Sequence, residues 1–461
     1  MRGVRAVALA GFASLLPLTP APARSATAAH NFLVLVADDL GVERIGRYQG
    51  TPVGSRTPHI DALAAGGVLF RNAWSSPMCS PSRAILLTGR YGFRTGIGGN
   101  VHPVHGWNGG LGPEELTLPK LLADRYPTAA FGKWHLDSAM AKPNVDQPRR
   151  SGFGHFAGTP TNLMRGQTYT SWEKTVNGVT LPGRVTTYAT SAVVDDALSW
   201  IAGNHEPWLV WIGFHAVHAP LHAPPPHLHS VPLPGPPEAF PLEHHAAMLE
   251  ALDHEIGRLL AGLAPEVRGR TTVVFAGDNG TPRKLALAPS SPSAGKGTPY
   301  EGGLHVPLIV ASPHTPPARR GQESRALVGL VDVFATLAEI AGAPARETDS
   351  VSLLPYLVDP SRASLRSTIY AEYFYPNGPG PYSIRTQAVR NARHKLVRRD
   401  CSRDELYDLE ADPLERRDLL RPGPPAPEEA TAHRHLVRAL EALVPRDCAA
   451  PRQLRTGPGA G

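Results

Sequence analysis

Four short segments of this chain share one design, an uninterrupted apolar run followed at once by ionisable or amide side chains. They are NFLVLVADDLG from Asn31, TAAFGKWHL from Thr128, PWLVWIGFHAVHAP from Pro207 and TTVVFAGDNG from Thr271. Apolar runs without alternation are typical of strands buried on both faces of a parallel sheet. Any one polar ending could be a simple turn, but ligands of open parallel sheets bind at the carboxyl ends of the strands. The four segments together therefore predict an α/β fold with one site at that edge.

The segments between these runs carry helical patterns. HHAAMLEALDHEIGRLLAGL precedes the run at Thr271 and predicts a helix packed on the sheet, with one apolar face made of Met248, Leu252, Ile256, Leu260 and Leu263. TPHIDALAAGGVLF, from Thr57, predicts a short helix that leads into a strand. The proline-rich segments 220–241 and 421–427 predict surface connections.

A chain of 461 residues is too long for one simple core, which predicts a large domain and a smaller one. From about Ala363 the pattern changes to short alternating segments, STIYAEYF, YSIRTQAVRN, HKLVRR and DELYDL, which predict an antiparallel sheet. The segment EEATAHRHLVRALEALV predicts a helix packed on that sheet. We expect a main domain over 30–362 that carries the site, a smaller domain over 363–450 and a disordered tail over 451–461.

The N-terminal residues predict export. Two arginines precede an apolar run of about 13 residues, and small residues and prolines follow, which is the layout of a secretory signal over 1–29. The run is too short to span a bilayer, and no later stretch reaches about 18 apolar residues. We expect a periplasmic or extracellular protein without a membrane anchor, and a disordered cytosolic leader is the alternative.

The net charge of +6 comes from lysines and arginines scattered along the chain. Nucleic-acid binding requires a clustered basic surface, so we expect no nucleic-acid partner. The mild positive charge suits an anionic substrate.

Three carboxylates and one amide oxygen follow two of the apolar runs, at Asp38, Asp39, Asp278 and Asn279. Hard oxygen ligands of this kind suit Ca²⁺ or Mg²⁺. Without a cation these carboxylates would repel one another, and a bound ion could polarise an ester oxygen. Zinc is the alternative, because eight of the 20 histidines lie in 215–254. No HExxH motif or pair of CxxC knuckles accompanies them.

Cys79 stands in SSPMCSPSRAILLTGRY, between prolines and near an arginine. The chain has three cysteines, and a disulfide between Cys401 and Cys448 would leave Cys79 unpaired. A buried free thiol is the commonest fate of such a residue. Its rigid and cationic surroundings favour instead a reactive group held in place.

The stretch CSPSRAILLTGR, from Cys79 to Arg90, resembles the signature of the type I sulfatases, Cys-x-Pro-Ser-Arg followed by Thr-Gly-Arg. Six further segments occur in the same order as in that family, namely VADDLG, FGKWHL, FHAVHAP, AGDNG, GKGTPYEGG and ELYDLEADPLERRDL. The resemblance covers Asn31 to about Leu420 and is nearest to the arylsulfatases. It implies a sulfuric ester hydrolase with the alkaline-phosphatase-like fold, in which helices sandwich a mixed, mostly parallel sheet and a smaller antiparallel-sheet domain follows.

In that family a separate formylglycine-generating enzyme oxidises the signature cysteine to formylglycine, an aldehyde that hydrates to a geminal diol. The resemblance implies that Cys79 is the nucleophile precursor and that Arg83 holds the hydrated aldehyde. One hydroxyl attacks sulfur, and the second allows collapse to the aldehyde with release of sulfate. A thiol or a serine has no second hydroxyl and could not be reset in this way.

The resemblance assigns the remaining site residues by their matching positions. Calcium, or alternatively magnesium, would be bound by Asp38, Asp39, Asp278, Asn279 and the modified Cys79. Lys133 and Lys296 would bind sulfate oxygens, and His135 would hydrogen-bond the diol. His218 lies near the leaving-group oxygen, so either His218 or Lys296 would protonate the departing alcohol.

The chain departs from the family at His305, where arginine is common, and we expect altered packing or pH behaviour near Lys296. HPVHGWNGG, with His102, His105 and Trp107, lies where an aromatic platform for substrate could stand. His215 could be structural or substrate-facing and is left out of the catalytic set.

Two other functions stay open, a phosphonate monoester or phosphodiester hydrolase and a non-catalytic glycan-binding relative. The substrate, a small-molecule or glycan sulfate ester, and the oligomeric state also stay open.

Overall fold

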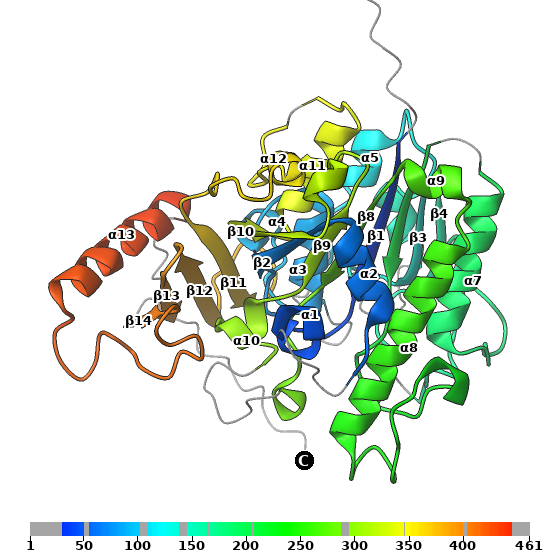
Figure 1. Cartoon of the computed structure of the whole chain (residues 1–461), viewed down its shortest axis with the longest axis horizontal. Coiled ribbons are helices and arrows are strands. Elements are labelled where there is room, and N and C mark those ends of the chain that lie inside the picture. The colour runs from blue at the N-terminus through cyan, green and yellow to red at the C-terminus, as the bar shows by residue number, and fades with distance from the viewer. Residues whose placement is uncertain are drawn as a thin grey trace, which may run out of the picture.

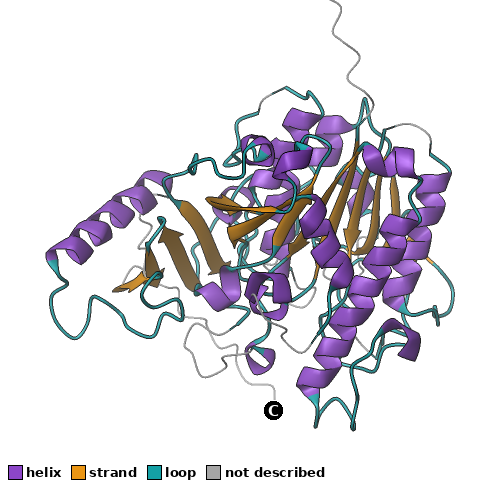
Figure 2. Ribbon diagram, in the orientation of Figure 1, coloured by secondary structure: helices purple, strands orange, loops and turns teal. Residues whose placement is uncertain are grey.

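The computed structural model describes residues 30–49, 55–101, 109–137, 145–163, 166–204, 207–286, 295–344, 346–399 and 403–444. Helices cover both faces of a ten-stranded sheet, and a separate four-stranded sheet with one long helix lies beside it (Figures 1 and 2). The predicted alkaline-phosphatase-like α/β fold is therefore confirmed. The predicted signal over 1–29 and the tail over 451–461 lie outside the described residues.

The four predicted strands are neighbours in the large sheet. They are β8 (Thr271–Gly277), β1 (Asn31–Ala37), β7 (Leu209–Gly213) and β3 (Thr128–Lys133), in this spatial order and mutually parallel. Every residue of all four is buried. Successive side chains of β1 enter cores on opposite faces of the sheet, which explains why these strands are apolar without alternation.

The remaining strands extend this parallel centre on both sides. The complete order is β10-β2-β9-β8-β1-β7-β3-β4-β5-β6, with bounds β2 (Val68–Trp74), β4 (His155–Thr159), β5 (Thr175–Val176), β6 (Val179–Thr180), β9 (Leu308–Ala311) and β10 (Gln322–Gly329). Strand β9 is antiparallel to both of its neighbours, and β5 and β6 are antiparallel additions at one edge. The sheet is thus mixed and mostly parallel.

The helices form two layers. One core packs α3 and α11 on the sheet, and the other packs α2, α7 and α8 on the opposite face. The helices are α1 (Gly46–Gln49), α2 (Pro58–Gly66), α3 (Cys79–Thr88), α4 (Gly92–Thr95), α5 (Leu118–Leu122), α6 (Gln147–Arg150), α7 (Ala189–Ala202), α8 (Pro241–Ala261), α9 (Pro265–Gly269), α10 (Glu301–Leu304), α11 (Asp332–Ile340), α12 (Leu354–Val358) and α13 (Pro427–Leu443). No helix within the described ranges is long and apolar enough to cross a membrane.

Helix α8 is the predicted helix before β8, with two differences. It begins at Pro241, where proline suits the first turn, and ends at Ala261, so the predicted face residue Leu263 lies beyond it. Met248, Leu252 and Ile256 are fully buried, whereas Leu260 is only partly buried. Helix α2 leads into β2, as predicted from the sequence.

The C-terminal pattern also gives the predicted elements. Strands β11 (Ile369–Tyr375), β12 (Ile384–Arg390), β13 (His394–Arg399) and β14 (Arg403–Asp408) form an antiparallel sheet. Helix α13 packs on it through Leu436 and Leu440. The boundary expected after residue 362 falls between α12 and β11 and stays a prediction.

Helix α2 takes its N-terminal cap from another helix. The buried carboxylate of Asp253, on α8, accepts hydrogen bonds from the backbone N–H groups of His59 (3.1 Å) and Ile60 (2.8 Å) in the first turn of α2. The N-cap residue Thr57 makes no capping bond of its own. One carboxylate therefore joins α2 to α8.

We predict that Asp253→Asn changes how stability depends on pH. Burial raises the pKa of Asp253 from 3.8 to about 6, so between these values the folded protein holds a proton that the unfolded chain releases. The free energy of unfolding of the wild type therefore falls as pH rises from about 4 to about 6. Asparagine has no charge to acquire, so the variant does not lose this stability. Its thermal unfolding midpoint should therefore rise relative to that of the wild type across that range.

The matched variant is Asp253→Ala, which removes the acceptor at every pH and should lower stability by about 1 kcal/mol. Parallel midpoint curves for Asp253→Asn and the wild type would contradict this account of the Asp253 charge.

Candidate active site

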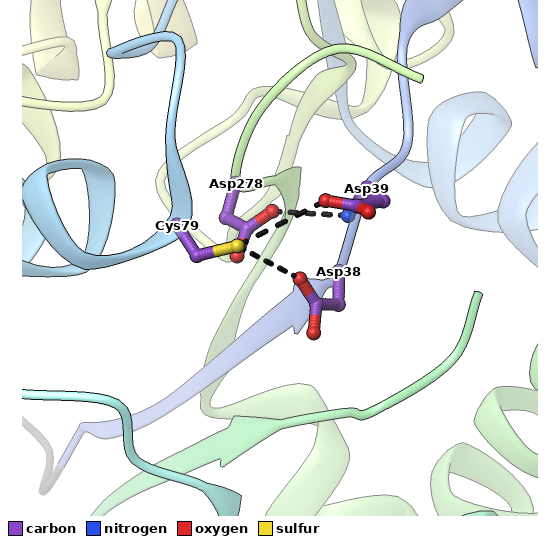
Figure 3. A group of neighbouring side chains, drawn as sticks. All are labelled: Asp38, Asp39, Cys79 and Asp278. Carbon is purple, nitrogen blue, oxygen red and sulfur yellow. Dashed lines mark hydrogen bonds between the residues drawn. The ribbon is translucent and has the colours of Figure 1, made fainter. Parts of the chain in front are cut away.

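The polar side chains that follow the four central strands converge at one edge of the sheet. Asp38 and Asp39 follow β1, Asp278 and Asn279 follow β8, and Lys133 ends β3. Figure 3 shows the three carboxylates pointing toward the Cys79 sulfur, which comes from the start of α3. All of these residues are buried. The predicted convergence is therefore present in the fold.

Cys79 is the first residue of α3 and is fully buried. Its Sγ lies 3.3 Å from Asp38 Oδ1, 3.9 Å from Asp39 Oδ1 and 3.1 Å from Lys296 Nζ. Burial, together with the charges of Asp278 and Asp38, raises the pKa of the Cys79 thiol far above its ordinary value. The thiol therefore stays protonated at neutral pH and is a poor nucleophile in its own right.

Two of the three carboxylates pair with lysines. Lys133 Nζ lies 2.5 Å from Asp38 Oδ2, and Lys296 Nζ lies 2.5 Å from Asp39 Oδ1. Burial opposes the charge of Asp38, but the Lys133 ammonium and the other positive charges around it together outweigh burial and hold the pKa of Asp38 well below its usual range. The two lysines thus neutralise two of the three buried carboxylates.

The surroundings of Asp278 disfavour its negative charge. Burial and the neighbouring Asp38 charge raise the pKa of Asp278 to about 6. The Arg83 guanidinium opposes this effect, since its Nε and Nη2 lie 3.1 and 3.0 Å from Asp278 Oδ2. One further positive charge near Asp278 would relieve the conflict between the carboxylates.

The arrangement fits a divalent cation. One ligand atom from each of Asp38, Asp39, Cys79 and Asp278 lies within 4.8 Å of the others. Asn279 Nδ2 donates to Asp39 Oδ1 (2.8 Å), while the buried Asn279 Oδ1 has no hydrogen-bond partner among the described residues. A buried amide oxygen without a partner is costly unless something binds it. A hard cation such as Ca²⁺ or Mg²⁺ would use this oxygen together with the carboxylates.

Arg83 is held from two sides. Beside its pair with Asp278, its Nη1 donates to the carbonyl of Lys133 (2.8 Å), and the side chain is fully buried. Gly213, at the end of β7, makes room for it, because a Cβ there would lie 2.7 Å from Arg83 Nη1. The guanidinium therefore connects α3 to the ends of β3 and β8.

The three candidate histidines differ in their surroundings. His218 Nε2 lies 3.7 Å from Asp39 Oδ2, and its Nδ1 bonds the Ala219 carbonyl (2.7 Å), so the partly exposed ring directs Nε2 into the site. His135 is buried, its Nδ1 has no partner in the part of the chain that the structure describes, and burial together with the Lys133 charge lowers its pKa well below the usual value. Its imidazole is thus neutral. His215 bonds Thr159 Oγ1 (2.7 Å) and, with burial lowering its pKa to about 3, is a neutral structural group.

Some supporting residues gave no recognisable signal in the sequence. Ser80 Oγ donates to the carbonyl of His135 (2.7 Å), and the Ser80 N–H donates to Asn100 Oδ1 (3.2 Å) beside Cys79. Tyr169 reaches the turn that carries His218. Ser80 fills the variable position of the Cys79 signature, and Asn100 and Tyr169 stand in no motif with a chemical spacing, because each acts through the backbone of another segment.

Other sequence expectations fall elsewhere. His305 Nε2 bonds the Arg71 carbonyl (2.7 Å) and Nδ1 lies 3.7 Å from Glu301, so its polar contacts are with β2 and α10. The suggested platform at His102, His105 and Trp107 lies outside the described residues, as does the proposed Cys401–Cys448 disulfide.

Comparison with known proteins agrees with this site. The family model described as Sulfatase matches residues 30–343, and one described as N-sulphoglucosamine sulphohydrolase, C-terminal, matches residues 295–443. The chain is 28% identical to steryl-sulfatase of Mus musculus over 93% of this chain and 83% of that protein. It is 30% identical to arylsulfatase A of Bos taurus over 88% of this chain and 86% of that protein.

A solved structure shares the same architecture. The crystal structure of Ps i-CgsB in complex with k-i-k-neocarrahexaose superimposes with a TM-score of 0.71 and 25% identity, over 90% of this chain and 92% of that one. The first family model spans most of the chain, including the segments that carry Cys79 and the carboxylates. The chain therefore belongs to the type I sulfatase family and is a sulfuric ester hydrolase.

Proposed function

We propose that this sulfatase hydrolyses sulfate esters to an alcohol or phenol and inorganic sulfate with a formylglycine derived from Cys79 and a bound Ca²⁺ ion. The observation that carries the proposal is the position of Cys79 Sγ, buried 3.3 Å from Asp38 and 3.1 Å from Lys296. A sulfur atom in this position touches both a cation-binding carboxylate and an anion-binding lysine.

The environment of Cys79 argues against thiol chemistry. Burial and the neighbouring carboxylates raise its pKa, so without a bound cation the unmodified side chain would not form a thiolate. A thiolate bound to the cation would still lack the second hydroxyl that allows release of sulfate. Formylglycine requires no such ionisation, because its hydrate supplies the attacking oxygen and a second hydroxyl that permits return to the aldehyde. This proposal makes a formylglycine-generating enzyme a partner during maturation.

The charges of the site suit an anionic ester once a cation is bound. The carboxylates of Asp38, Asp39 and Asp278 are matched by Lys133, Lys296 and Arg83. Calcium, bound by the three carboxylates, Asn279 Oδ1 and the modified Cys79, would supply a further positive charge that polarises the sulfate oxygens. Lys133 and Lys296 would then be available to bind sulfate, which is their proposed role.

The two site histidines take different roles in this proposal. His135, a neutral imidazole, accepts or donates a hydrogen bond to the hydrated side chain at position 79. His218 bonds the Ala219 carbonyl through Nδ1, which makes that atom the N–H, and so leaves Nε2 to carry a proton to the departing oxygen. Lys296 is less suited as the acid, because its ammonium pairs with the Asp39 carboxylate at 2.5 Å, which favours the charged form.

The substrate is a small-molecule or glycan sulfate ester. The neocarrahexaose bound by the solved relative is a glycan, which favours testing oligosaccharides first. We also propose export of the mature protein, with the main domain over 30–362 and the smaller domain over 363–450. Each of these assignments follows from the sequence patterns described above.

The first prediction of this proposal concerns the residue itself. The tryptic peptide Asn72–Arg83 from natively produced protein should carry an aldehyde in place of the Cys79 thiol, measured by mass spectrometry. A quantitative thiol in active protein would contradict the proposal.

Cys79→Ser should lower kcat/KM for an aryl sulfate by at least roughly 10³-fold, because the nucleophile is lost. An aryl phosphonate ester should be turned over more slowly, and a strong preference for it would favour the phosphonate hydrolase instead.

The second prediction concerns the metal. Removal of divalent cations with EGTA should lower the thermal unfolding midpoint and abolish turnover, since three buried carboxylates lose their shared counter-charge. Added Ca²⁺ should restore both, with about 3 kcal/mol of stabilisation at a hundredfold excess over its Kd. Asp278→Asn serves as the matched control and should respond weakly to Ca²⁺. A wild-type midpoint that is indifferent to EGTA and Ca²⁺ would contradict the metal assignment.

A further inference from the structure

The turn that carries His218 is held by a tyrosine from a distant segment. Tyr169, in the segment after β4, is 1% exposed, and its hydroxyl lies 2.6 Å from the His215 carbonyl and 2.7 Å from the His218 carbonyl. The His218 N–H also donates to the His215 carbonyl (2.9 Å), which closes the turn. The single proton of this hydroxyl is shared between the two carbonyls, so one group bridges both ends of the turn between β7 and the site.

The bridging hydroxyl is a permanent donor. Burial, together with nearby Tyr188, raises the pKa of Tyr169 well above its ordinary value, so the group keeps its proton at neutral pH. Both partners are carbonyl oxygens, which only accept hydrogen bonds. Without this hydroxyl the two carbonyls would lose a buried donor, and the turn would be free to rearrange.

The Tyr169 ring is itself fixed. The His222 ring stacks on it at 4.1 Å with an interplanar angle of 27°, and the Tyr188 ring stacks at 5.8 Å and 30°. The Tyr169 carbonyl also accepts the backbone N–H of Ala189, at the start of α7 (2.7 Å). The hydroxyl thus has one position, set by packing, from which it can reach the turn.

We infer that Tyr169 is a positioning residue that aligns His218 with the departing oxygen of the substrate. The inference rests on the proposed role of His218 as the proton donor. His218 makes few side-chain contacts of its own, through Nδ1 to Ala219 and at 3.7 Å to Asp39, so the orientation of its ring depends on the backbone that Tyr169 holds. A displacement of the turn would move Nε2 away from the reacting oxygen with little change in sulfate binding by the lysines.

The test is Tyr169→Phe, which keeps the stacked ring and removes only the hydroxyl. Tyr188→Phe is the matched control, because it removes a neighbouring hydroxyl that bonds His222 Nε2 (3.2 Å) and not the His218 turn. Both variants and the wild type are assayed with aryl sulfates of graded leaving-group pKa. Tyr169→Phe should lower kcat roughly tenfold to a hundredfold for poor leaving groups, with KM nearly unchanged, and should steepen the dependence of rate on leaving-group pKa. Tyr188→Phe should follow the wild type.

An equal loss of kcat for all leaving groups, or the same behaviour in both variants, would overturn the inference, since a merely structural effect does not select poor leaving groups.

A crystal structure of Tyr169→Phe gives a second measurement independent of turnover. If the wild type hydrolyses no sulfate ester, the proposed function fails, and the crystal structure then decides whether Tyr169 positions the His218 ring. A displaced 215–218 turn with a reoriented His218 ring supports it, and an unchanged turn overturns it.

Discussion

The buried balance of charge at the ends of the central strands is the constraint on which the rest of the structure depends. Three carboxylates lie close enough to share one ion, and burial makes each of them costly without a partner. Arg83, Lys133 and Lys296 provide those partners from three different segments. The fold must therefore bring α3, β3 and the loop before α10 to the same edge of the sheet.

The C-terminal sheet helps to hold the neighbours of two of these segments in place, strand β2 before α3 and helix α10 after the Lys296 loop. Lys395, on β13, is fully buried and lies 3.1 Å from Glu301 and 2.8 Å from Glu415. Glu301 begins α10, four residues after Gly297, and also accepts the indole N–H of Trp74 at the end of β2 (3.1 Å). The Lys395 ammonium stands 4.8 Å from the Trp74 ring. The small sheet thus braces both the strand that leads to Cys79 and the helix that follows Lys296.

The strands were predictable because their burial on two faces leaves a simple pattern. Apolar runs without alternation occur where both faces are covered, and the polar residues after them mark the carboxyl edge. The supporting contacts were not predictable. Asp253 caps a helix that lies far from it in the chain, and Tyr169 acts on the backbone of another loop. Backbone groups look alike in every sequence, so contacts made to them leave no pattern.

The sequence by itself determined the fold class, the four central strands and the residues at their ends, since hydrophobic burial and local polar endings are properties of short segments. It also carried the sulfatase signature around Cys79. Only the tertiary structure decided which lysine pairs with which carboxylate, that the Asn279 oxygen lacks a partner among the described residues, and that the His218 turn is held by Tyr169. Those relations depend on distances between side chains from separate segments, and such distances exist only after the sheet has been assembled.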